Sequence, residues 1–95
     1  MRVIWTAQAE TELKAALSYA QLRWPGAVAK IAADVLGMVE RLRSFPLSGR
    51  SGVVAGTREL VLTRYPFIVV YMAGVDAVTV LRIYHQRMKW PPETA

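Results

Sequence analysis

The most constraining feature of the chain is an almost wholly apolar run, Tyr65-Pro66-Phe67-Ile68-Val69-Val70-Tyr71. A strand with one face in water alternates apolar and polar side chains, and residues 67–73 contain no polar alternation of that kind. We therefore predict a central strand over residues 67–73 that is covered on both faces. Such a strand needs a neighbour on each side, so the chain must build a sheet around it.

Residues 58–62 and 77–84 have strand character on either side of this run, and Ala73-Gly74-Val75-Asp76 supplies a turn. The short spacing predicts an antiparallel meander joined by hairpins. Residues 47–56 contain three glycines but no Gly-Lys-Ser/Thr after a strand, which a phosphate-binding loop needs. We interpret this segment as a flexible connecting loop.

The first half of the chain is predicted to be mainly helical. Residues 2–5 form a short strand, and Thr6 is suited to cap the helix that follows. Trp24-Pro25-Gly26 breaks that helix, and a long amphipathic helix then continues to Phe45, before Pro46 ends it. The short connection predicts an antiparallel helical hairpin.

The expected fold class is α+β, with the order β-α-α-β-β-β. A helical hairpin packs on one face of a small, largely antiparallel sheet whose other face is partly open. Residues 1–95 are expected to form a single domain, because their number lies near the lower end of the usual domain size.

Composition limits the function classes. The chain has no cysteine and one histidine, which leaves too few good ligands for a metal site, and no cofactor fingerprint is present. No apolar run approaches the roughly 20 residues of a membrane-spanning helix. We expect a cytoplasmic protein that needs no metal, no cofactor and no membrane.

The net charge of +5 is unevenly distributed. Residues 1–49 carry six Lys/Arg and four Asp/Glu, whereas residues 50–90 carry six Lys/Arg and two Asp/Glu. A basic surface favours nucleic acid or an acidic protein partner, and a solvated surface that maintains solubility is the alternative.

Arg82, Arg87 and Lys89 flank His85, the only histidine, and Arg58 lies on the first strand of the predicted meander. The place of His85 at the end of the last predicted strand suits acid–base chemistry, but a histidine that only bonds a neighbouring loop is the plainer interpretation of the bare sequence. The cationic side chains could hold a phosphodiester or the carboxylates of a partner protein, and a tryptophan beside two prolines suits an interface. These candidate binding residues are Arg58, Arg82, Arg87, Lys89 and Trp90.

Five segments carry a resemblance to a known family. In chain order they are Ile4-Trp5 with Ala9-Glu10-Thr11-Glu12-Leu13, then residues 42–50, 56–60, 65–71 and 80–87. Together they are similar to the RelE/ParE superfamily of toxins from type II toxin–antitoxin systems. The resemblance covers nearly the whole chain and implies a growth-inhibiting toxin, of the ParE-like plasmid stabilisation type, that a cognate antitoxin neutralises. The antitoxin is expected to be acidic and to fold on binding.

The resemblance implies two alternative mechanisms. RelE-like members cut messenger RNA on the ribosome and carry an arginine where this chain has Ile68; in that mechanism His85 and Arg87 would be catalytic, with Arg58 and Arg82 positioning the RNA. ParE-like members bind and poison DNA gyrase without being enzymes, and have an apolar residue at this position. His85-Gln86-Arg87-Met88 also resembles the end of a ParE strand. The ParE-like mechanism is favoured, and an endoribonuclease is the alternative.

Overall fold

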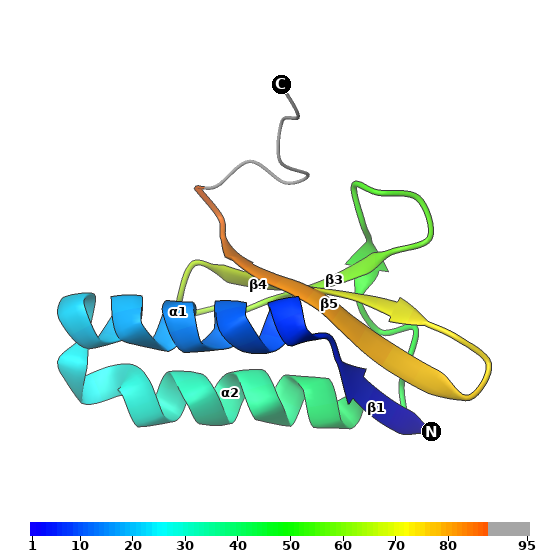
Figure 1. Ribbon diagram of the computed structural model, residues 1–95, viewed down its shortest axis with the longest axis horizontal. Helices are drawn as coiled ribbons and strands as arrows, with labels where there is room; N and C mark the ends of the chain where they lie inside the picture. Colours follow the sequence, from blue (N-terminus) through cyan, green and yellow to red (C-terminus); the bar gives the residue numbers. More distant parts are fainter. Residues whose placement is uncertain (88–95) are drawn as a thin grey trace.

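A mixed five-stranded sheet lies against a pair of helices in the computed structural model, which describes residues 1–87 (Figure 1). This arrangement confirms the predicted α+β class. The elements, in chain order, are β1 (Arg2–Trp5), α1 (Ala7–Arg23), a 3-10 turn (Pro25–Ala27), α2 (Val28–Arg41), β2 (Arg50–Ser51), β3 (Arg58–Val61), β4 (Phe67–Ala73) and β5 (Ala77–His85).

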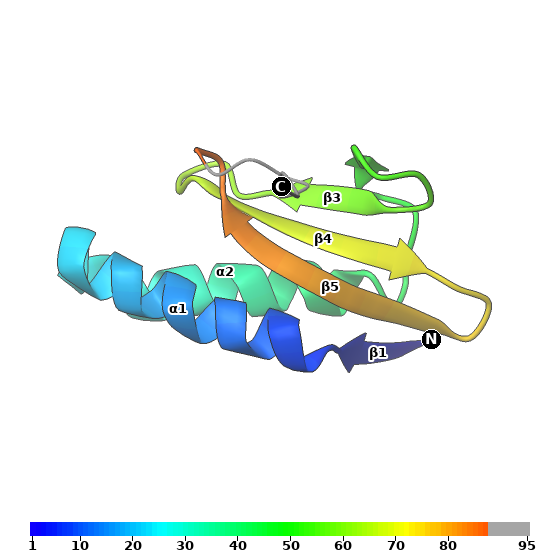
Figure 2. The same cartoon turned by 45° about the horizontal axis from the view of Figure 1, so that its top comes forward.

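The strands lie in the order β1-β5-β4-β3-β2, so β4 is the central strand, as predicted (Figure 2). The β3–β4 and β4–β5 pairs are antiparallel hairpins, and within residues 1–87 only the β1–β5 pair is parallel. Residues Phe67 to Tyr71 of β4 are all buried. The unbroken apolar run is therefore explained by burial on both faces.

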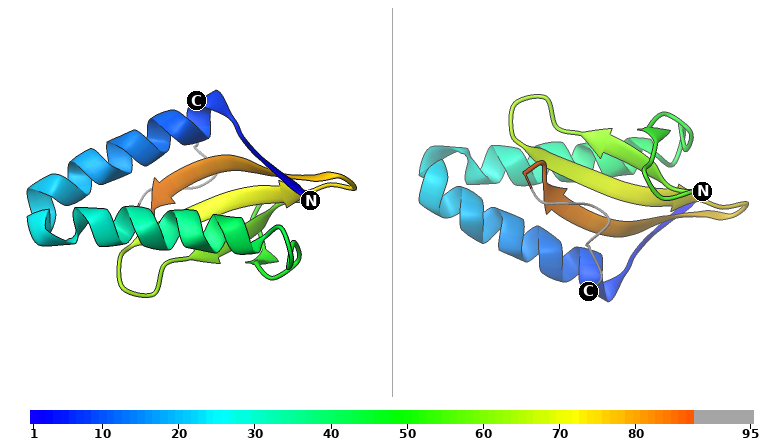
Figure 3. Two further views of the ribbon diagram at one scale, coloured as in Figure 1. Left: turned by 90° about the horizontal axis from the view of Figure 1, so that it is seen from below. Right: turned by 90° about the horizontal axis from the view of Figure 1, so that it is seen from above.

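Helices α1 and α2 run antiparallel and cover one face of the sheet (Figure 3). The Thr6 side chain caps α1 by accepting a hydrogen bond from the backbone N–H of Ala9 at 3.0 Å. Alternate residues of β4 point into the helix-facing core, and the others point to the opposite face, where Ile68, Val70 and Tyr84 form a second buried cluster. The helix-facing core contains Ala9, Ala20, Ile31, Val35, Val39, Leu62, Phe67, Val69, Val80 and Ile83.

Helix α2 ends at Arg41, which is earlier than the predicted end at Phe45. The backbone tightens after this point, because the N–H of Leu42 bonds the carbonyl of Val39 at 3.0 Å, three residues back. Leu42 is buried against Tyr71 of β4, whereas Phe45 is 65% exposed. The apolar periodicity continues beyond the helix, so it does not mark the end of this element.

The segment predicted as a flexible loop includes a short edge strand, β2, that pairs with β3. The carboxylate of Glu59 holds it in place. Its Oε1 accepts hydrogen bonds from Arg50 Nε at 3.0 Å and Nη2 at 2.8 Å, and its Oε2 accepts one from the Val53 N–H at 3.3 Å. The Glu59 side chain is 1% exposed and that of Arg50 is 59% exposed.

This asymmetry in burial predicts an asymmetric response to mutation. Arg50→Ala leaves a buried carboxylate without its guanidinium, and we expect it to lower the free energy of unfolding by about 2 kcal/mol. Glu59→Gln should lower the free energy of unfolding by less, because the exposed guanidinium of Arg50 can be hydrated instead. The double variant Arg50→Ala/Glu59→Gln should recover about 1 kcal/mol relative to Arg50→Ala. Urea unfolding of the four proteins measures these values, and strict additivity would contradict the assignment.

Candidate functional site

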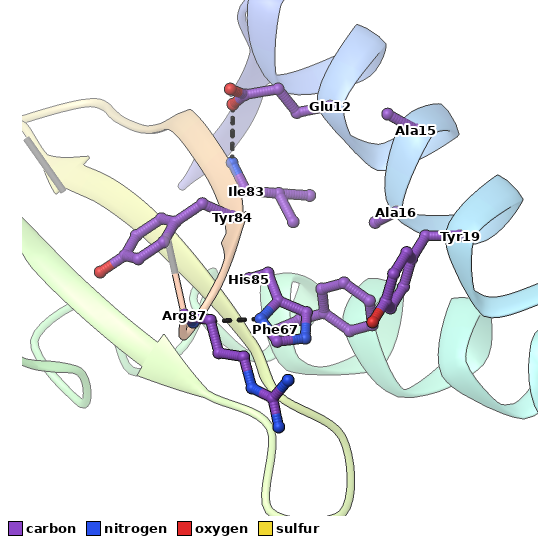
Figure 4. A pocket seen from close by; sticks show the side chains of 9 residues that line it. All are labelled: Glu12, Ala15, Ala16, Tyr19, Phe67, Ile83, Tyr84, His85 and Arg87. Carbon is purple, nitrogen blue, oxygen red and sulfur yellow. Dashed lines mark hydrogen bonds between the residues drawn. The ribbon is translucent and has the colours of Figure 1, made fainter. Parts of the chain in front are cut away.

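A pocket of about 530 Å³ lies between α1 and the end of β5 (Figure 4). On the helix side the pocket is lined by alanines, whose small side chains leave space between the helix and the strand. At the other end, the rings of Tyr19, Phe67 and His85 pack together, and Arg87 lines the pocket beside them. The residues that line it are Glu12, Ala15, Ala16, Tyr19, Phe67, Ile83, Tyr84, His85 and Arg87.

The pocket exists because β5 is longer than its outer neighbour. Strand β1 ends at Trp5, which lies opposite Val80, and β5 continues to His85. Beyond Val80 the chain of β1 turns away into α1, with the Thr6 N–H bonded to the Val80 carbonyl at 3.1 Å. The final part of β5 is consequently next to a helix and not next to another strand.

Glu12 of α1 occupies this edge of β5. Its Oε1 accepts a hydrogen bond from the Ile83 backbone N–H at 2.9 Å, and its Oε2 lies 2.7 Å from Arg82 Nη2. Arg82 Nε also contacts both carboxylate oxygens, at 2.9 and 2.8 Å. Paired in this way, Glu12 substitutes for a missing strand and neutralises Arg82 at the same time.

His85 is packed edge-on against two rings, with centroid distances of 5.5 Å to Tyr19 and 5.7 Å to Phe67. Its Nδ1 accepts a hydrogen bond from the Arg87 backbone N–H at 3.0 Å, so the neutral ring carries its proton on Nε2. Burial lowers the pKa of His85, and the positive charges of Arg87 and Arg23 lower it further. The imidazole is therefore neutral near pH 7.

The structure brings only some of the predicted site residues together. His85 and Arg87 lie at the pocket, and Arg82 points to Glu12 beside it. Arg58 lies elsewhere, where its Nη1 donates to the carbonyls of Leu47 at 3.2 Å and Gly49 at 2.9 Å. Lys89 and Trp90 lie outside the described residues.

Sequence reasoning did not select Glu12 or Tyr19 as site residues. The signal was present, because Glu12, Ala16 and Tyr19 follow one another at intervals of four and three along α1 and so share one helix face. The pattern alone, however, does not say which strand that face would meet.

Comparison with known proteins agrees with this architecture. The family model described as "ParE toxin of type II toxin-antitoxin system, parDE" matches residues 3–90. "Putative toxin Y4kP" of Sinorhizobium fredii (strain NBRC 101917 / NGR234) is 36% identical over 90 residues, which cover 95% of this chain and 93% of that protein. A chain in the solved structure of the chromosomal ParDE TA system from P. aeruginosa is 27% identical with a TM-score of 0.78; the match covers 90% of this chain and 95% of that one.

The helical hairpin on a mixed sheet, together with these likenesses, defines the class of protein as a toxin of a type II toxin–antitoxin system. Within that class, the chain belongs to the ParE toxin family. The predicted resemblance to the RelE/ParE superfamily is thereby confirmed. Within the described residues, no helix is long and apolar enough to cross a membrane.

Proposed function

We propose that the protein inhibits growth by binding DNA gyrase in the cytoplasm, and that a cognate antitoxin from the same operon neutralises it. The observation that carries the choice of target is the burial of Ile68, which is 5% exposed on the central strand. RelE-like nucleases resemble one another in having an arginine at this position. A buried isoleucine donates no hydrogen bond and carries no charge for a phosphodiester.

The neighbouring arginines do not replace that charge in this structure. Arg82 is paired with Glu12, and the Nη1 of Arg58 donates to two backbone carbonyls of the segment that follows α2. To reach a phosphate, each would have to give up these internal contacts. Loss of one preorganised transition-state donor typically costs about a hundredfold to a thousandfold in rate. This supports inhibition by binding over catalysis.

One observation favours the endoribonuclease as a second candidate. His85 is neutral near pH 7 with a charged Arg87 two residues away, and a neutral imidazole can accept a proton from an attacking hydroxyl. In that mechanism His85 is the general base and Arg87 stabilises charge at the scissile phosphate.

The deciding experiment measures both activities on one purified protein. We expect gyrase-dependent DNA cleavage by the wild type, with translated messages left uncut in primer extension. Arg87→Ala should weaken the gyrase effect about tenfold or more, because a charged anchor at an interface commonly contributes over 1 kcal/mol. The matched control is Arg41→Ala, an exposed arginine in the last turn of α2.

A different outcome would favour the nuclease. Message cuts that depend on the ribosome and vanish in His85→Ala, while gyrase is unaffected by the wild type, would replace the gyrase proposal with the nuclease. Thermal unfolding followed by circular dichroism must show that each variant is folded before its activity is compared.

A further inference from the structure

The charges around the pocket between α1 and β5 do not balance. Among the described residues that line it, the one carboxylate is that of Glu12, which is already paired with Arg82. At the other end, the exposed Arg87 lines the pocket, and the exposed Arg23 places its guanidinium carbon 5.9 Å from the centre of the Tyr19 ring. A ligand that enters this end therefore meets an excess of positive charge.

The floor and walls of the pocket are apolar. Ala15 and Ala16 leave space on the helix side, and Phe67 and Ile83 form the opposite side (Figure 4). A volume of about 530 Å³ lies in the range of sites that enclose organic groups. An apolar side chain fits this surface, and a carboxylate next to it would lie near the cationic end.

The His85 ring lies where the cationic end of the pocket meets its apolar walls. Because its Nδ1 accepts the Arg87 N–H, the Nε2–H is the donor that the neutral ring has left for a ligand. Protonation of Nδ1 would break the bond to the Arg87 N–H, and Arg87 and Arg23 also oppose a positive ring. A carboxylate at this position would offset both costs.

We propose that this pocket receives an acidic, apolar segment of the antitoxin, with an apolar side chain against Ala16 and Phe67 and an adjacent carboxylate bound by His85 and Arg87, so that binding is coupled to proton uptake by His85. The inference rests on the proposed toxin–antitoxin function and adds the chemistry of recognition. A second copy of the chain is a poor occupant, since its net charge is +5 and its own basic half would face Arg23 and Arg87.

The sign of the pH dependence follows from the charged and titratable groups around His85. Tyr19 on α1 packs against its ring, and the charges of Arg23 on α1 and Arg87 after β5 act on it. Glu12 on α1 lines the same pocket but is paired with Arg82, and the preceding Tyr84 on β5 belongs to the cluster on the opposite face of the sheet. In the free toxin, burial and the two arginines hold the pKa of His85 below 6.5. A bound carboxylate raises that pKa, so binding takes up a proton. Affinity must then increase as the pH falls through the pKa of the complex, and level off below the pKa of the free toxin.

The test uses the complex formed from the two operon products after each has been expressed and purified separately, with only the toxin isotope-labelled at histidine. His85 is the sole histidine of the chain, so its ring signals are unambiguous in NMR. We expect its titration midpoint to move to higher pH in the complex. A midpoint shift of one unit corresponds to about tenfold tighter binding at low pH than at high pH.

Variants distinguish proton uptake by His85 from the general attraction between a basic toxin and an acidic segment. His85→Gln should remove the pH dependence of affinity between about pH 8 and about pH 5.5, where an unperturbed histidine titrates. Arg87→Gln should weaken binding about tenfold at both ends of this range. Arg41→Gln, in the last turn of α2 and outside the lining of the pocket, should change neither quantity.

A complex in which His85 titrates as in the free toxin would overturn the inference and leave the proposed function intact. So would a pH dependence that survives in His85→Gln. If a ribonucleic acid oligomer shifts the His85 signals and the antitoxin does not, the pocket belongs to nucleic acid and the inference is wrong. Failure of the operon products to form any complex would remove the inference and the proposed antitoxin together.

Discussion

Glu12→Ala is expected to lower the free energy of unfolding by about 3 kcal/mol, since it removes one partner of a largely buried ion pair and also an acceptor for a backbone N–H. The side chains of Glu12 and Arg82 are 20% and 16% exposed, and the Ile83 N–H lies on the β5 edge that β1 does not reach. A domain of this size has only about 5 to 15 kcal/mol of stability. The variant should therefore lose a large part of it.

Urea unfolding measures this loss, and two variants identify its cause. Glu12→Gln keeps an oxygen for the Ile83 N–H but not the charge for Arg82, so its loss should be smaller. Glu10→Ala removes an exposed acid from the first turn of the same helix and should cost under about 1 kcal/mol, the usual size of a helix-dipole effect. Equal midpoints for Glu12→Ala and Glu10→Ala would show that the edge of β5 needs no carboxylate.

Tyr71→Ala is expected to lower the free energy of unfolding by about 4 kcal/mol, the range for removal of a buried aromatic side chain. Tyr71 is fully buried on β4, against Leu42 and Val78. Its hydroxyl accepts a hydrogen bond from the Gly49 N–H at 2.9 Å and donates one to the Pro46 carbonyl at 2.9 Å. It thus fastens the segment after α2 to the sheet.

Tyr71→Phe isolates the contribution of the hydroxyl. The ring stays, but the buried Gly49 N–H loses its acceptor, and we expect a loss of about 1 to 3 kcal/mol. Tyr19→Phe, at a tyrosine that is 36% exposed, is the matched control and should change stability by less than about 0.5 kcal/mol. Loss of toxicity in Tyr71→Ala would then report unfolding. An unchanged urea midpoint for Tyr71→Phe would show that the segment after α2 is held by other contacts.

The elements with strong local signals were predicted correctly. The apolar run specified β4 as the central strand, the polar Thr6 specified the start of α1, and the Pro25 region specified the break between the helices. These predictions depend on periodicity and on backbone preferences that act over a few residues. The predicted end of α2 was wrong because it also relied on periodicity. Phe45 continues the apolar period of the helix, although its side chain is exposed.

The partners of the charged residues could not be predicted in the same way. Arg82 and Glu12 are 70 residues apart, and Arg58 donates to a carbonyl 11 residues away. In β5 an extra residue, Leu81, shifts the register between the Val70–Arg82 and Tyr71–Val80 pairs. Such a bulge redirects side chains locally, and its sequence signal is weak.

By itself, the sequence determined the fold class, the central strand, the basic character of the second half and the resemblance to the toxin superfamily. These features depend on hydrophobic pattern, helix capping and composition, which are local properties of the sequence. Only the tertiary structure decided which cations are exposed at the pocket and which are used in internal contacts. That outcome depends on where β1 ends beside β5 and on which face of α1 meets the exposed edge. Both features are set by packing between elements that are far apart in the chain, so no local sequence pattern encodes them.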